Sequence, residues 1–194
     1  RGGRMHPRPE ALYYHIAHTA LQKARSETDE FERKQAVVTA IIFSALCLEA
    51  FINQEYAAHP ETRKIIENDR SLSLELKWLL LPLLLEAKVT FDKRARPFQT
   101  FHELIGVRNE RLVHFKPLKE THESPPGRKK PYEPYFGDLI NDVARSESYV
   151  GCVGDIIRKL NELTSGKVSV PPFLSDSQYL SEISAWTQTS YESR

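Results

Sequence analysis

The apolar run at residues 37–52, VVTAIIFSALCLEAFI, constrains the fold more than any other stretch of this chain. Plotted on a 3.6-residue period, it is hydrophobic on nearly every side, which is typical of a helix buried in the middle of a domain. Thr28, Asp29 and Glu30 precede it, and they resemble a helix start with an N-cap hydroxyl and acidic residues in the first turn. We therefore predict a long central helix from Thr28 to about residue 58.

The composition supports a single all-α domain. The chain has 194 residues, of which 40% are hydrophobic and 27% charged, with only 8 glycines, so it is long enough to bury a substantial core. Cys47 and Cys152 lie far apart in apolar stretches, and we expect reduced core thiols in a cytoplasmic protein, a disulfide being the less favoured alternative.

No membrane partner is expected from the sequence. Residues 1–8 are basic, and no apolar segment follows them as it would in a signal peptide. The apolar run at residues 78–85 is shorter than the roughly 20 residues that cross a bilayer.

The remaining apolar periodicities predict an up-and-down bundle of about five main helices within residues 9–165. Proline and serine residues suggest where several of them begin or break. The expected features are a first helix at residues 9–25, a short helix after Pro60, a helix that starts at Ser71 and is kinked or broken at Pro82, an amphipathic helix from Phe101, and a last helix from about Gly137 to near Gly166.

Two segments do not fit the bundle. Residues 117–134 contain five prolines and one glycine among charged residues, which predicts a mobile basic loop within the domain. In the tail, residues 166–194, the side chains of Tyr179, Leu180, Ile183 and Trp186 predict a short helix that docks on its own chain or covers a neighbouring protomer.

Three polar residues interrupt the amphipathic helix: Arg108, Asn109 and His114. The guanidinium of Arg108 is always charged and can bind two phosphate oxygens at once. His114 titrates near neutral pH, so it can take a proton from one oxygen and return it to another. An amide at Asn109 can orient either neighbour. This combination suits phosphodiester cleavage without a metal.

A continuous α-helix would not bring these side chains together. Six residues correspond to roughly 600°, which leaves Arg108 and His114 about 120° to 240° apart around the axis. Either the helix bends near residues 106–109, or a second copy across a two-fold axis completes the site.

The motif resembles that of the HEPN superfamily, small all-helical domains that include many RNases of toxin and defence systems. Arg108, Asn109 and His114 read R-N-x-x-x-x-H, with Leu112-Val113 before the histidine and Phe115-Lys116-Pro117 after it. The resemblance implies a homodimer whose arginine and histidine line a cleft between protomers. It also implies metal-independent RNA cleavage by 2′-hydroxyl attack, with no cofactor.

Two residues are candidates for supporting roles. Glu49 breaks the apolar face of the central helix, and two interpretations stay open: it pairs with Arg108, or it points along a groove into water. Arg111 lies one turn before His114 and is either a substrate contact or a residue that shares the role of Arg108.

Positive charge is concentrated around the motif. Residues 88–130 carry 11 Lys/Arg and 5 Asp/Glu, an excess of +6 in a chain whose net charge is +1. Such clustering predicts contacts with a phosphate backbone, whereas any one of these residues alone would suit a solvated loop. The candidate nucleic-acid-binding residues are Lys93, Arg94, Arg96, Lys116 and Lys119.

No metal site is expected. His15 and His18 lie one turn apart, but neither a carboxylate nor a cysteine close to them in sequence completes a ligand set.

The sequence therefore predicts a cytoplasmic endoribonuclease that acts on RNA, with an antitoxin or other regulatory protein as a further partner. The alternative is a non-catalytic HEPN-like module for dimerisation or for binding nucleotide or RNA, in which the same three polar residues pin helices at a subunit interface.

Overall fold

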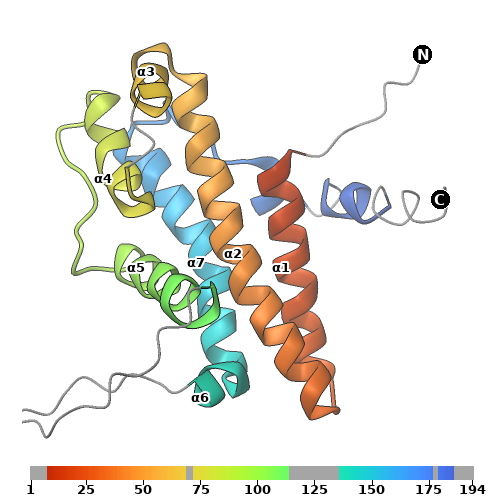
Figure 1. The fold of residues 1–194 in the computed structure, drawn as a ribbon. Coiled ribbons are helices and arrows are strands. Elements are labelled where there is room, and N and C mark those ends of the chain that lie inside the picture. Colours follow the sequence, from red (N-terminus) through yellow and green to blue (C-terminus); the bar gives the residue numbers. More distant parts are fainter. Residues whose placement is uncertain (1–7, 69–71, 114–135, 177–178, 186–194) are drawn as a thin grey trace, which may run out of the picture.

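A computed structural model describes residues 8–68, 72–113, 136–176 and 179–185. Within these ranges the chain forms helices and their connections, with no β-strand (Figure 1). The predicted all-α class is confirmed.

Helices α1 (Pro9–Ser26) and α2 (Glu30–Ala58) form a long antiparallel hairpin. The predicted boundaries agree closely, but the N-cap of α2 is Asp29 rather than Thr28: its carboxylate accepts the backbone N–H of Glu32 at 2.9 Å. Side chains of α2 are buried on several sides, and α2 contacts α1, α3, α4, α5, α6 and α7. The predicted central helix is confirmed.

The short helix α3 (Pro60–Asn68) is followed by α4 (Leu74–Leu84). The N-cap of α4 is Ser73, whose hydroxyl accepts the N–H of Leu76 at 3.2 Å, whereas the predicted cap, Ser71, lies outside the described residues. Pro82 does not break α4, which continues to Leu84, because a proline so near the C-terminus removes only one of the last backbone hydrogen bonds.

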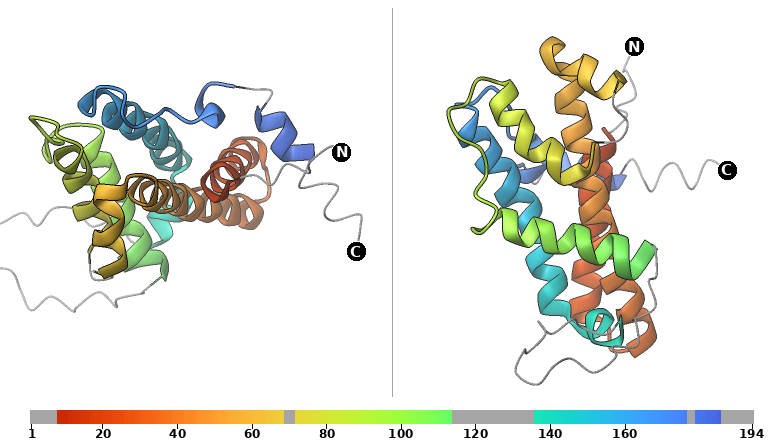
Figure 2. Two further views of the ribbon diagram at one scale, coloured as in Figure 1. Left: turned by 90° about the horizontal axis from the view of Figure 1, so that it is seen from above. Right: turned by 60° about the vertical axis from the view of Figure 1, so that its left-hand side comes forward.

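Helix α5 (Phe98–Val107) lies across α2 and α7, whereas α1, α2 and α7 run alongside one another (Figure 2). It begins three residues before the predicted Phe101. Its inner face belongs to an aromatic cluster in which Phe101 lies 5.6 Å from Trp78 and 5.3 Å from Phe98, measured between ring centroids. This crossing corrects the predicted topology, because one of the main helices does not run up or down the bundle.

The predicted last helix is two helices, α6 (Phe136–Asn141) and α7 (Val143–Leu163). Asp142 separates them with a non-helical backbone (ψ 84°), and its carboxylate accepts the N–H of Arg145 at 2.8 Å. After α7 the chain turns at Gly166 (φ +81°), whose N–H donates to the carbonyl of Asn161 at 2.9 Å. The core residues of these two helices include Leu139 of α6 and Val150, Val153, Ile157 and Leu160 of α7, which are all buried.

The C-terminal segment packs on its own chain. The short 3-10 helix η2 (Pro172–Leu174) places the ring of Phe173 5.1 Å from that of Tyr14. Residues 179–185 are helical, and Ile183 is fully buried in the main core. A short docking helix is therefore present, although Trp186 lies outside the described residues.

In the part of the chain that the structure describes, α2 is the one helix long and apolar enough to meet the criteria for a membrane span. Of its most apolar window, 56% is buried inside the fold, and the core helix of a soluble protein meets the same criteria. Cys47 and Cys152 are both free thiols and buried, as the sequence predicted. Burial raises the pKa of Cys152 to about 12, so this thiol stays protonated at neutral pH.

Candidate functional site

The backbone changes its helical geometry at Arg108. The N–H of Arg108 donates to the carbonyls of Leu104 and Ile105, and six residues starting with Arg108 form the π-helix η1 (Arg108–Val113). Short π-helical segments widen the helix locally and are frequent at functional sites. One of the two expectations placed a bend near residues 106–109; what the structure has there is the start of this π-helical turn.

The side chain of Arg108 is held by two neighbours. Its Nη1 donates to Oδ1 of Asn109 at 2.8 Å, and its Nη2 lies 3.4 Å from Oε2 of Glu49 on α2. The predicted pairing of Glu49 with Arg108 is confirmed, and the pair links η1 to the central helix. Because the Glu49 side chain is 40% exposed, the second interpretation, a carboxylate that faces water, also holds in part.

This ion pair lies at the surface rather than in the core. The side chain of Arg108 is 25% exposed, so solvent screens its attraction to Glu49, and such pairs typically contribute about 0–1 kcal/mol to stability. Arginine has five N–H donors, and the two contacts above leave others for a bound anion. The guanidinium is thus oriented by protein groups and remains reachable from solvent.

The other motif residues are described only in part. Arg111 lies within η1 and is half buried, and the side chain of Leu112 packs against the main core. His114, Lys116 and Lys119 lie outside the described residues, and so does the predicted loop at residues 117–134.

The basic residues before α5 are separated from Arg108. Lys93, Arg94 and Arg96 are exposed in the connection between α4 and α5. Arg108 follows the other end of this 10-residue helix, about 15 Å away along its axis. The structure therefore divides the described residues of the predicted basic region into two parts, with Lys93, Arg94 and Arg96 at one end of α5 and Arg108 and Arg111 at the other.

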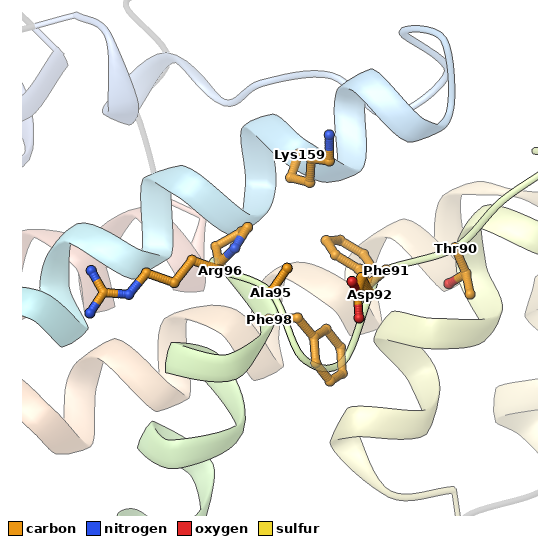
Figure 3. Close-up of a pocket in the computed structure, with 8 residues that line it drawn as sticks. Thr90, Phe91, Asp92, Ala95, Arg96, Phe98 and Lys159 are labelled. Atoms are coloured by element: carbon orange, nitrogen blue, oxygen red, sulfur yellow. The ribbon is translucent and has the colours of Figure 1, made fainter.

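A small pocket of about 150 Å³ lies next to the first part (Figure 3). Phe91 and Phe98 line it, together with Arg96 and with Lys159 of α7. In Figure 3 the guanidinium of Arg96 extends along α7, away from the two rings. Sequence reasoning missed Lys159 because only the packing of α7 against this connection brings it close.

Sequence reasoning also missed a polar cluster between α5 and α7. The hydroxyl of Tyr149 donates to Oε1 of Glu103 at 2.9 Å. Nε of Arg145 lies 3.9 Å from the same oxygen and 3.4 Å from Oδ2 of Asp142. Burial, with the carboxylate of Glu103 as a smaller cause, raises the pKa of Tyr149 far above its usual value, so the phenol acts as a hydrogen-bond donor here.

Another polar cluster surrounds Glu10, whose carboxylate is 1% exposed at the start of α1. Its Oε2 accepts a hydrogen bond from Nε2 of Gln54 at 2.7 Å, and its Oε1 forms an ion pair with Arg8, 2.7 Å from Nε, so the buried charge is compensated. Nearby, burial raises the pKa of Glu55, and His59 partly offsets this increase. We assign this cluster a structural role, joining the N-terminus of α1 to the C-terminal half of α2.

Among the described residues no group of three or more His, Cys, Asp or Glu side chains is placed to hold a metal ion. His15 and His18 are close in space as the sequence suggested. Two effects lower the pKa of His15: burial of its side chain, which is the larger, and the charge of the neighbouring His18.

Comparisons with family models, with curated proteins and with solved structures gave no match. The resemblance to the HEPN superfamily therefore depends on Arg108, Asn109, His114 and their sequence neighbours.

Proposed function

We propose that this chain is a metal-independent endoribonuclease of the HEPN type that acts in the cytoplasm as a toxin or defence effector. The observation that supports the proposal most is the position of Arg108. It starts a π-helical turn at the surface, it is oriented by Asn109 and Glu49, and it precedes His114 by six residues in sequence.

The proposed reaction is an internal transfer at phosphorus. His114 takes the proton of the ribose 2′-hydroxyl, the 2′-oxygen forms a bond to phosphorus, and the bond from phosphorus to the 5′-oxygen breaks. The leaving oxygen takes up a proton, which gives a 2′,3′-cyclic phosphate and a 5′-hydroxyl end. Arg108 stabilises the negative charge that builds on the other phosphate oxygens, a contribution that can exceed that of proton transfer.

The remaining residues position these groups. Asn109 and Glu49 restrict the rotamers of Arg108, which lowers the entropy lost when a phosphate binds. Arg111 is a further substrate contact. Lys93, Arg94 and Arg96, together with Lys116 and Lys119, would bind the RNA backbone on either side of the scissile phosphate, so binding should weaken steeply with salt.

The proposal is tested with purified chain and single-stranded RNA in the presence of EDTA. We expect fragments with 2′,3′-cyclic phosphate ends, and we expect the His114→Ala variant to produce none. His102→Ala is the matched control, because His102 is an exposed histidine on α5 that pairs with Glu75 at 2.7 Å. If the two histidine variants have equal activity, or if the wild type cleaves none of a varied set of RNAs, the proposal is wrong.

One observation favours the alternative, a non-catalytic module for dimerisation or for nucleotide or RNA binding. Glu49 already compensates the charge of Arg108, and a carboxylate at 3.4 Å competes with an incoming phosphate. Under this alternative, Arg108→Ala should lower the melting temperature or weaken a homodimer without loss of any reaction. Expression in a growing bacterium separates the two functions, since only a nuclease should arrest growth in a manner that depends on His114.

A further inference from the structure

The pocket beside the α4–α5 connection has the volume of one six-membered ring (Figure 3). Its volume is about 150 Å³, and an apolar protein cavity of about that volume holds a benzene molecule. A purine base has two fused rings and exceeds this space. The pocket therefore suits a single ring, such as that of a pyrimidine base.

Two phenylalanine rings form the apolar wall of this pocket. Phe91 and Phe98 are only 6% and 2% exposed, and their ring centroids lie 5.5 Å apart. The fully buried Trp78 packs edge to face against Phe91, with 6.1 Å between the centroids. Because the core holds both rings, the wall exists before a ligand binds. The little ring surface that remains exposed suits edge-to-face contact with an inserted ring.

The polar side chains of the lining include two hydrogen-bond acceptors. Oδ1 of Asp92 accepts the backbone N–H of Arg94 at 2.8 Å, which leaves Oδ2 for a ligand. The hydroxyl of Thr90 donates to the carbonyl of Leu79 at 2.6 Å, so its oxygen can still accept a hydrogen bond. Cytosine has an amino group that a carboxylate recognises, whereas uracil has a carbonyl oxygen at the same ring position. These acceptors therefore favour cytosine.

Two cationic side chains also line the pocket, and they suit the phosphate groups of a nucleotide. Lys159 of α7 is 46% exposed and pairs with Glu162 at 2.9 Å. Solvent screens a pair this exposed, so a phosphate can take the place of the carboxylate. The stem of Arg96 lines the pocket, and its guanidinium extends along α7, away from the rings, where it is exposed (Figure 3).

We propose that this pocket binds the base of a cytosine nucleotide, which is either free or part of single-stranded RNA. Asp92 selects the base, and Lys159 and Arg96 bind phosphate. The RNA case rests on the proposed ribonuclease function. Arg108 follows the opposite end of α5, about 15 Å away along its axis, and a single strand spans this distance in a few nucleotides. Cleavage should then occur at a fixed spacing from a cytosine.

Fluorescence anisotropy of labelled tetranucleotides measures the base preference, with the His114→Ala chain used so that no cleavage interferes. We expect the cytidine tetramer to bind at least about fivefold more tightly than the uridine or adenosine tetramer. Competition with CMP separates the two sources, because displacement shows that a free nucleotide fills the pocket, whereas cytosine-selective binding without displacement restricts it to RNA. Equal affinities for the three tetramers, or no binding of any, would overturn the proposal.

Asp92→Asn tests the residue that selects the base. The carbonyl oxygen of an asparagine can keep the hydrogen bond from Arg94, which places the amide N–H donors where Oδ2 of Asp92 now lies. We expect the preference to shift from cytidine to uridine, since uracil has an acceptor where cytosine has its amino group. A variant that binds both tetramers with equally altered affinity would show that Asp92 is merely structural.

Lys159→Ala should weaken the binding of all three tetramers and reduce its dependence on salt. Lys23→Ala is the matched control, because Lys23 on α1 is 49% exposed and also pairs with a glutamate, Glu32. Equal losses in the two variants would indicate an effect of net charge alone and would contradict the role of Lys159.

The cleavage pattern separates this inference from the proposed ribonuclease. In an oligoadenylate with a single cytosine, the wild type should cut at one fixed distance from that cytosine. Cuts at every position would support the ribonuclease and contradict the cytosine pocket. Cytosine-selective binding without any cleavage would support the pocket and contradict the ribonuclease.

Discussion

The α1–α2 hairpin and the α5–η1 segment are built in opposite ways. The hairpin is joined to α7 through small buried residues, with Ala17 of α1 and Ala40 of α2 both fully buried beside Val150 of α7. The α5–η1 segment instead packs large aromatic rings at one end and has a half-buried π-helical turn rich in polar residues at the other. The hairpin should therefore determine stability, whereas the π-helical turn should contribute little to it and be used for function.

Among these substitutions, Leu48→Ala in α2 should lower the free energy of unfolding most, because the Leu48 side chain is fully buried. Removing these methyl groups leaves a cavity in a packed core, which should lower the free energy of unfolding by about 2–5 kcal/mol. Urea denaturation measures this loss. Leu83→Ala, at a 47% exposed position, should cost far less, and equal losses would contradict the assignment of the core.

Ala17→Leu should give the next largest loss of stability. The added side chain has no space between α1, α2 and α7, so overpacking should lower the free energy of unfolding by about 1–3 kcal/mol. The same change at Thr19, which is exposed on α1, is the control. A stable Ala17→Leu variant would show that the three helices are packed less closely than the structure indicates.

Tyr56→Phe should cause a smaller loss of stability at neutral pH. It removes the hydrogen bond that the Tyr56 hydroxyl donates to the carbonyl of Lys77 at 3.0 Å, which contributes about 0.5–1.5 kcal/mol.

The pH dependence of this variant gives a second test. Burial raises the pKa of Tyr56 to about 12, whereas an unfolded tyrosine titrates near 10. Between these values the folded state holds more protons, so stability falls as the pH rises. The Tyr56→Phe variant should lose less stability over this range than the wild type, and identical slopes would contradict the assignment.

The smallest effect on stability is expected for Arg108→Ala. Because the Glu49–Arg108 pair is partly exposed, the loss should be about 0–1 kcal/mol. Arg145→Ala removes a similarly exposed arginine from its acidic partners Glu103 and Asp142, so it should lower the free energy of unfolding by about 0–1 kcal/mol as well. A large loss only at Arg108 would favour the structural module over the nuclease.

Much of the helical frame could be predicted from the sequence because its signals are local. The bounds of α1 and α2 and the apolar stripe of α7 follow from periodicity within each helix. The break at Asp142 was missed because an aspartate fits both a helix surface and an N-cap. The crossing of α5 depends on contacts of Phe101 with Trp78 and of Phe98 with Phe91, which no local pattern reveals.

The candidate site was partly predictable because some of its signals are also local. Glu49 and Arg108 each interrupt an apolar stripe, and two such interruptions suggested a pair, which the structure contains. The approach of Lys159 to the α4–α5 connection arises from packing between helices. No local sequence pattern indicates it, and none indicates the π-helical turn.

The most direct test of the central claim is the yield of 2′,3′-cyclic phosphate ends from single-stranded RNA in EDTA, measured for the wild type, Arg108→Ala and Arg145→Ala at equal folded concentration. The account predicts cyclic ends from the wild type and from Arg145→Ala, and none from Arg108→Ala. Equal yields from the two arginine variants would contradict it.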